Sequence, residues 1–189
     1  GGGAPCHLGF DRTGQCLLVA NYSGGNVATF PLAADGSLLP AAQVVQHEGS
    51  GPNPNRQEGP HAHWAGVDDA NRFAFVVDLG IDRVIGYRID PAGARLTPEP
   101  GAGFTTRPGA GPRHLAFHPS DRFAFIINEL DSTLTSVAYR PDTGGMEEVQ
   151  TVSTLPEEHE GANSCAEVAV HPSGRFVFGS NRGHDSIAV

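Results

Sequence analysis

Five side chains near the ends of apolar segments suggest acid–base and anion chemistry: His61, His63, Arg113, Glu129 and Arg182. Arginine offers a planar fork of donors that fits a carboxylate or a phosphate. A histidine beside a glutamate can hold a water and remove its proton as a general base. The set predicts an anionic substrate that undergoes acyl hydrolysis or proton transfer. The catalytic candidates are His61, His63 and Glu129, and the substrate-binding candidates are Arg113 and Arg182.

A metal site at the two histidines is the first alternative. His61 and His63 lie two residues apart, so on a strand both would face the same side and could bind one ion. No third ligand with recognisable spacing follows, whereas zinc sites use three or four protein ligands. A serine nucleophile is disfavoured too, because the chain has no Gly-x-Ser-x-Gly elbow. We therefore expect no metal and no other cofactor.

The elements that must position these side chains form an internal repeat. Each of four units has a short strand, a turn rich in Asp, Pro, Ser and Gly, and an apolar strand that closes in Asn or Asp. The closing residues are 57, 50 and 53 positions apart, at Asn21, Asp78, Asn128 and Asn181. A third, alternating stretch follows in each unit. A fourth strand is expected at 38–46, around 95–98 and at 146–154.

Four antiparallel strands that repeat at this interval are typical of a propeller blade, whereas a β-sandwich has no reason to repeat its sequence. The sequence predicts an all-β protein with almost no helix, a single partial β-propeller domain over 1–189. About 3.5 to 4 blades of an expected seven are present, near 5–50, 60–105, 112–155 and, incomplete, 165–189. Such an arc cannot close a ring, so we expect a longer natural protein and self-association of this chain when it is made alone.

The geometry of a blade places the candidates at one end. Residues that start the first strand and residues that leave the second strand meet at the same end of their hairpin, near the propeller axis. Aligned on the proline that starts the first strand, the blades differ there at Cys6, His61 and Arg113. After the closing residue they differ again, at Tyr22, Leu79, Glu129 and Arg182.

The repeat also indicates which histidines are structural, because a residue that recurs in every blade is expected to support the fold. On this alignment three histidines recur in the first strand and are expected to make repeat-stabilising hydrogen bonds, namely His7, His63 and His114. Two more lie in equivalent turns at the far end, His118 and His171. For Glu129 two interpretations stay open: it pairs with an arginine and merely fastens neighbouring blades, or it belongs to a ligand site.

Composition excludes several partners. The net charge is −9, all 12 basic residues are Arg, and no basic stretch occurs, which disfavours nucleic acid and anionic membranes. The odd set of Cys6, Cys16 and Cys165 has no Cys-x-x-Cys spacing, so neither a disulfide framework nor a zinc site is expected. With no apolar run long enough to cross a membrane, we expect a cytoplasmic protein.

Six motifs in register resemble the seven-bladed propeller lactonase family, which contains propeller-type 6-phosphogluconolactonases and carboxymuconate-lactonizing enzymes. They are Asn21-Tyr-Ser-Gly-Gly25, Gly59-Pro-His-Ala-His63, Asp78-Leu-Gly-Ile-Asp-Arg83, Gly109-Ala-Gly-Pro-Arg-His-Leu115, Asn128-Glu-Leu130 and Ser180-Asn-Arg-Gly-His-Asp-Ser186. The resemblance implies a site of one His, two Arg and one Glu. It places them at His61 or His63, Arg113, Glu129 and Arg182.

The activity that the resemblance implies is hydrolysis of a sugar-acid lactone, with 6-phosphogluconolactone as the first candidate. The partner would be a small anionic substrate, and the pathway one of carbohydrate metabolism. Two alternatives remain. One is a cycloisomerase that forms a lactone from a muconate-type acid, and the other is a non-catalytic propeller that serves as a binding module, since propellers host many functions.

Overall fold

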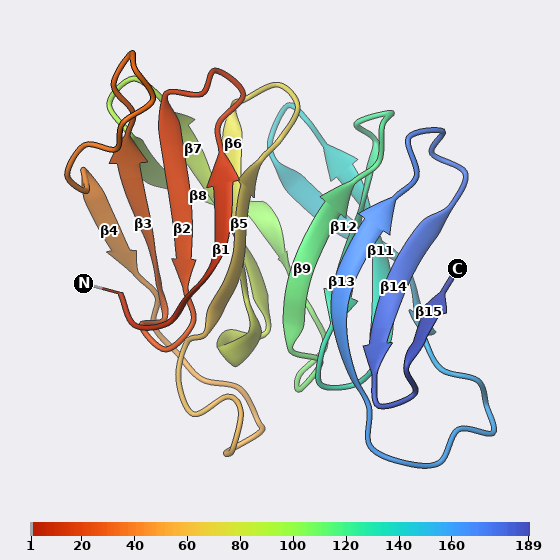
Figure 1. Cartoon of the computed structure of the whole chain (residues 1–189). Coiled ribbons are helices and arrows are strands. Elements are labelled where there is room, and N and C mark those ends of the chain that lie inside the picture. The colour runs from red at the N-terminus through yellow and green to blue at the C-terminus, as the bar shows by residue number, and fades with distance from the viewer. Residues whose placement is uncertain (1) are drawn as a thin grey trace.

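The structure, a computed structural model, describes residues 2–189 as an arc of antiparallel sheets (Figure 1). The first blade contains β1 (Pro5–Phe10), β2 (Cys16–Asn21), β3 (Asn26–Pro31) and β4 (Gln43–Gln46). The second contains β5 (Ala62–Val67), β6 (Phe73–Asp78), β7 (Arg83–Asp90) and β8 (Arg95–Thr105), with the short 3-10 helix η1 (Leu79–Ile81) after β6. The third contains β9 (Pro112–Phe117), β10 (Phe123–Asn128), β11 (Thr133–Arg140) and β12 (Gly145–Ser153). The last sheet contains β13 (Ser164–Val170), β14 (Val177–Arg182) and β15 (Ser186–Ala188).

Within each blade the strands follow the chain in simple order, from an inner strand to an outer one. The inner strands β1, β5, β9 and β13 lie side by side toward the axis (Figure 1). This is the blade arrangement that the repeat predicts, and the all-β class with almost no helix is confirmed. Within residues 2–189 no helix is long and apolar enough to cross a membrane.

The core lies between blades, because the apolar second strand of each blade presents side chains to both neighbours. In β6 all six residues are buried. Its even-numbered members Ala74 and Val76 pack toward the first blade, whereas Phe73, Phe75 and Val77 pack toward the third. The two-residue period of a strand explains this split. A second strand that is apolar along its whole length is therefore needed wherever a blade packs between two neighbours.

The outer strands differ from the sequence expectation. The first blade's outer strand is confined to Gln43–Gln46, with only an isolated bridge between Leu32 and Leu38 before it. In the second blade the outer strand extends to Thr105, well beyond the expected segment. It also forms a single parallel bridge from Gly103 to Gly145, which joins the second and third blades into one eight-stranded sheet. A side chain at Gly103 would meet the Val84 carbonyl oxygen at 2.1 Å, so this close approach requires glycine.

The closing Asn or Asp of each second strand ties the turn that follows it. Asp78 is fully buried, and its carboxylate accepts hydrogen bonds from the backbone N–H of His61 at 2.7 Å and of Gly80 at 3.0 Å. Its other oxygen lies 2.6 Å from Nδ1 of His47, whose Nε2 lies 3.0 Å from the Tyr87 hydroxyl. The structural role expected for this position is confirmed.

The far end of the blades holds the turn histidines. Nδ1 of His118 lies 2.7 Å from the Ser120 hydroxyl, and its Nε2 lies 2.9 Å from the Gly174 carbonyl oxygen of the next blade. His171 makes the equivalent local contact with Ser173 at 2.8 Å. Both histidines are therefore structural, as the repeat indicates.

Replacing Asp78 with alanine should lower the free energy of unfolding by about 2 to 4 kcal/mol, because two buried N–H groups and His47 would lose their acceptor. Urea unfolding at pH 7 measures the effect. Asp35→Ala is the matched control, since Asp35 is an exposed turn residue that also accepts a backbone hydrogen bond. An equal loss in both variants would contradict the role assigned to Asp78.

Candidate active site

Every inner strand carries an irregularity near its start, and this irregularity defines equivalent positions among the blades. Pro5 pairs with Asn21, Ala62 with Asp78, and Pro112 with Asn128. The next residue is skipped in each pairing, and the register resumes at His7, Trp64 and His114. The skipped residues Cys6, His63 and Arg113 are therefore counterparts. A bulge of this kind re-aims one side chain without disturbing the rest of the strand.

This register corrects the alignment based on the starting proline. His63, and not His61, is the counterpart of Arg113. His61 corresponds to Gly111, because the carbonyl oxygens of both accept a hydrogen bond from the residue after the closing Asn or Asp, Leu79 in one blade and Glu129 in the other. Pro60 consequently lies two residues before its strand, whereas Pro5 and Pro112 are the first residues of theirs. The counterpart of His7 is Trp64, so His63 is specific to its blade rather than a recurring structural histidine.

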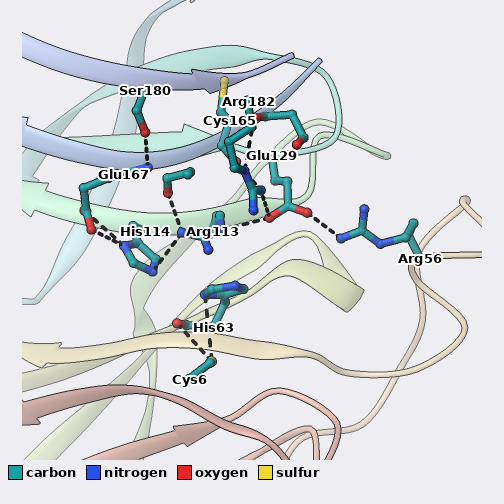
Figure 2. A network of polar contacts seen from close by, with 12 residues as sticks. Cys6, Arg56, His63, Arg113, His114, Glu129, Cys165, Glu167, Ser180 and Arg182 are labelled. Atoms are coloured by element: carbon teal, nitrogen blue, oxygen red, sulfur yellow. Dashed lines mark hydrogen bonds and ion pairs between the residues drawn. The ribbon is translucent and has the colours of Figure 1, made fainter. Parts of the chain in front are cut away.

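Glu129 lies at the centre of the candidate site, between arginines on both sides (Figure 2). Its side chain is only 7% exposed. Oε2 accepts a hydrogen bond from Nε of Arg113 at 2.9 Å and lies 2.9 Å from Nη2 of Arg182. Oε1 accepts one from Nη2 of Arg56 at 2.5 Å. Three of the residues that the sequence predicts, Arg113, Glu129 and Arg182, are thus brought together, and a third arginine joins them.

Electrostatics keep this glutamate ionised. Burial by itself would raise the pKa of Glu129, but the hydrogen bond from Arg56 and the positive charges of Arg182 and Arg113 outweigh it and hold the pKa below its usual range. Burial lowers the pKa of Arg113, although an arginine stays charged in proteins. Three positive groups and one carboxylate leave a net charge of +2, which makes the cluster attractive to an anion.

Arg113 is fixed by more than Glu129. Its Nη1 donates to the Ala166 carbonyl oxygen at 2.7 Å and lies 3.3 Å from Nε2 of His114. The other nitrogen of His114 lies 3.0 Å from the Glu167 carboxylate. Since the guanidinium can only donate, His114 accepts at Nε2 and carries its proton at Nδ1, toward Glu167. The chain Glu167–His114–Arg113 therefore orients the guanidinium from the side opposite Glu129.

His63 is a neutral histidine beside this cluster. Its ring packs edge-on against His114 at 5.1 Å between centroids and against Tyr22 at 5.5 Å. Burial, with a further contribution from the charge of Arg113, lowers its pKa to about 4. Nδ1 lies 3.9 Å from the Cys6 sulfur, and Nε2 makes no hydrogen bond to any group within residues 2–189. An uncharged imidazole with one uncommitted nitrogen can act as a proton acceptor.

His61 is turned away from Glu129. Its ring stacks on Tyr22 at 4.4 Å between centroids. Nδ1 lies 3.1 Å from the Tyr22 carbonyl oxygen, and Nε2 lies 3.1 Å from the Glu58 carboxylate. Both ring nitrogens of His61 are thus engaged by protein oxygens, away from the arginine cluster. Of the two catalytic histidine candidates, only His63 has a free nitrogen next to the arginine cluster.

Sequence reasoning missed Arg56, which lies in the irregular segment between the first two blades. That segment has no counterpart elsewhere in the repeat, so comparison between blades could not single it out. One signal was available: Arg56 stands five residues before the His-x-His pair, in a loop made of Asn, Pro and Gly, at the end where the other candidates were expected. Glu167 was likewise missed: it lies near the start of the fourth unit, which has no starting proline that would align it with the candidate positions of the other blades.

Open space borders the inner strands. A hollow of about 500 Å³ lies along Pro5–Leu8, beside Cys6 and hence beside His63. Another hollow, of about 430 Å³, belongs to the opposite end, where Arg12 and Pro119 are among its lining residues, and we do not associate it with the cluster. In the described part of the chain no group of three His, Cys, Asp or Glu side chains is placed to hold a metal ion.

The fold is that of a partial propeller, and a cluster of three arginines around one buried glutamate lies at one end of its blades. A family model described as "Lactonase, 7-bladed beta-propeller" matches residues 1–189. The chain therefore belongs to the seven-bladed β-propeller lactonase family, as its motifs predict.

Individual relatives agree with this assignment. The chain is 40% identical over 188 residues to a 6-phosphogluconolactonase of Bacillus subtilis (strain 168), covering 100% of this chain and 52% of the relative. It superposes on a periplasmic gluconolactonase of Pseudomonas aeruginosa with a TM-score of 0.89 and 35% identity, over 96% of this chain and 51% of the other. It also superposes on the crystal structure of a Lactobacillus plantarum protein with a TM-score of 0.91 and 33% identity, over 97% of this chain and 52% of the other. The chain thus spans about half the length of the relatives it matches.

The depressed pKa of His63 predicts a loss of stability in acid. The ordinary pKa is 6.5 and that of the folded protein about 4. Between these values the unfolded chain takes up a proton that the folded chain refuses, so stability falls as the pH falls from 6.5 toward 4, by at most about 3 kcal/mol for this residue.

Denaturant unfolding of wild type and His63→Asn at pH 7 and pH 4.5 checks this. The variant should lose less stability over the interval, since both proteins share the contributions of His7 and the carboxylates. Identical losses would show that His63 is not held in its neutral form.

Proposed function

We propose that the protein hydrolyses a sugar-acid lactone, with 6-phosphogluconolactone as substrate and 6-phosphogluconate as product. The observation that carries this is the +2 cluster around Glu129 beside the neutral His63. The names of the similar proteins support the same class of reaction, because they include a 6-phosphogluconolactonase and a gluconolactonase. Membership of the lactonase family supports the reaction type, and the excess positive charge of the cluster supports an anionic substrate.

In the proposed mechanism a water adds to the lactone carbonyl carbon. His63 takes one proton of that water at Nε2 while the carbonyl oxygen becomes negative. Arg113 and Arg182 bind the reacting end of the substrate and face this developing charge, and such fixed donors stabilise an oxyanion strongly in a partly buried site. The ring C–O bond then breaks, the leaving oxygen takes up a proton, and the open-chain acid results. The residues supply a base and a positive field, so the proposal needs no metal.

Glu129 is assigned mainly a positioning role in this scheme. A carboxylate held by three arginines, with its pKa below the usual range, is a poor proton acceptor compared with an uncharged imidazole. It can still accept a hydrogen bond from the attacking water and so orient it toward the carbonyl carbon. His61 is proposed to support the site by holding Tyr22 and Glu58, because both of its ring nitrogens face acceptors.

The compartment and pathway belong to this proposal. A 6-phosphogluconolactonase acts in carbohydrate metabolism, in the pentose phosphate pathway, and we place the protein in the cytoplasm. Cys6, Cys16 and Cys165 are free thiols, as a reducing compartment allows. One structurally similar protein is described as periplasmic, so fractionation of cells that express the complete gene product is the check.

Removing the charge of Glu129 should impair turnover. In the complete gene product, Glu129→Gln keeps the shape of the side chain but leaves three arginines without a carboxylate, and kcat/KM for 6-phosphogluconolactone should fall by about 100-fold. In Arg182→Ala, kcat/KM should fall by a similar factor. Glu147→Gln is the control, because Glu147 is an exposed residue paired only with Arg140. Unchanged turnover in Glu129→Gln and Arg182→Ala, or conversion of a dicarboxylate instead of the lactone, would overturn the assignment.

The pH profile tests the base. Because the pKa of His63 is lowered to about 4, its unprotonated form predominates above that pH. With glucono-1,5-lactone, which has no phosphate to titrate in this range, and after correction for spontaneous hydrolysis, kcat/KM should be flat from about pH 5.5 to 8 and decrease tenfold per pH unit below about pH 4. His63→Gln should remove most of the activity across the whole range. A rate that instead declines with an apparent pKa near 6.5 would point to a different histidine.

A further inference from the structure

Arg56 differs from the other two arginines of the cluster in how its donors are used. Arg113 and Arg182 each donate to backbone carbonyl oxygens of β13 and its neighbours as well as contacting Glu129. Arg56 makes no side-chain hydrogen bond to the backbone among residues 2–189: its Nη2 donates to Glu129, the Tyr22 hydroxyl lies within reach of its guanidinium, and its side chain is 39% exposed. A guanidinium has five N–H groups, so several of them remain for a ligand. Figure 2 shows Arg56 reaching Glu129 from the side opposite Arg113 and Arg182.

The position of Arg56 does not depend on its ion pair, because the neighbouring residue fixes the loop. Gln57 is fully buried, and its Nε2 donates to the Leu79 carbonyl oxygen at 2.9 Å and to the Asp82 carboxylate at 2.8 Å. Its backbone N–H donates to the Asn53 carbonyl oxygen at 2.7 Å. A side chain at Gly51 would meet the Gln57 amide at 2.5 Å. The loop is therefore preorganised, and a purely structural role for Arg56 would duplicate what Gln57 already does.

The net charge of the cluster differs with and without Arg56, and this difference indicates what Arg56 adds. Without it, Arg113 and Arg182 against Glu129 leave one positive charge, which suffices for the single negative charge that develops on a lactone oxygen. With it the excess is two, so Arg56 adds one positive charge that can offset part of the charge of a substrate's phosphate group. Arginine is suited to phosphate because two of its N–H groups can contact two phosphate oxygens at once. The two kinds of lactonase among the similar proteins differ in this group, since one is named for a phosphorylated lactone and the other is not.

We propose that Arg56 binds the substrate's phosphate group and sets the preference for phosphorylated over unphosphorylated sugar-acid lactones. The proposal rests on the lactonase function argued above and extends it to specificity. Arg113 and Arg182 serve the reacting carboxyl end of the substrate, whereas Arg56, on its preorganised loop at the other side of Glu129, contacts the distant phosphate. Its remaining donors and partial exposure leave it accessible to a ligand.

The test compares two lactones in the complete gene product. In Arg56→Gln, kcat/KM for 6-phosphogluconolactone should fall by 30- to 100-fold, while that for glucono-1,5-lactone should change by less than threefold. Arg56→Lys keeps the charge but not the paired N–H donors of the guanidinium, and its loss of kcat/KM for 6-phosphogluconolactone should be intermediate. Arg107→Gln is the matched control: it removes the same charge from another loop arginine, one paired with Asp131 at 2.7 Å, and should leave the ratio of the two substrates unchanged. Equal losses on both lactones, or no loss on either, would overturn the proposal.

A binding measurement separates this proposal from the proposed function. Calorimetry with 6-phosphogluconate and with gluconate reports on the phosphate contact without any turnover. If wild type hydrolyses neither lactone, the lactonase function fails, but Arg56 is still supported when wild type binds 6-phosphogluconate at least tenfold more tightly than gluconate and Arg56→Gln abolishes that difference. Equal affinities for the two acids in wild type would reject the role of Arg56, whatever the activity.

Discussion

The contact on which the site depends is the buried carboxylate of Glu129 against three guanidinium groups. Three arginines would repel one another at this spacing in a partly buried setting, and one carboxylate with two oxygens relieves that repulsion for all of them. Arg56 comes from the loop before the second blade, Arg113 from β9 and Arg182 from β14. A single residue thus holds together three segments that are far apart in the chain and leaves an excess of positive charge that a substrate can neutralise.

The blades contribute chemistry through one repeated irregularity. The bulge near the start of each inner strand presents one side chain per blade toward the axis while the pairing around it stays the same. Cys6, His63 and Arg113 occupy this position in turn, so identical backbone geometry presents a thiol, a neutral base and a cation. Because the strands are fixed by packing between blades, these positions can differ in residue type without cost to the core.

The fold was predictable from the sequence because the repeat, the apolar second strands and the turn residues all point to blades. Arg113, Glu129 and Arg182 were predictable as well, since they break the repeat at the end of the hairpin that faces the axis. The distinction between His61 and His63 was not predictable, because the starting proline marks different registers in different blades and only the strand pairing reveals the two extra residues after Pro60. Arg56 could not be predicted for another reason: its partner Glu129 is 73 positions away in the sequence, and an irregular loop follows no periodic pattern.

The positive cluster and the proposed base are also coupled to each other. The charge of Arg113 contributes to the low pKa of His63, so the empty site holds a weak but fully unprotonated base. An anionic substrate bound to the arginines offsets part of that positive field, and an offset of this sign raises the pKa of a neighbouring imidazole. His63 consequently becomes a stronger proton acceptor when substrate is present than when the site is empty. The arginines that bind the anion therefore keep His63 unprotonated before binding, and its pKa rises once the anion is bound. Substrate recognition and proton transfer thus depend on the same charges.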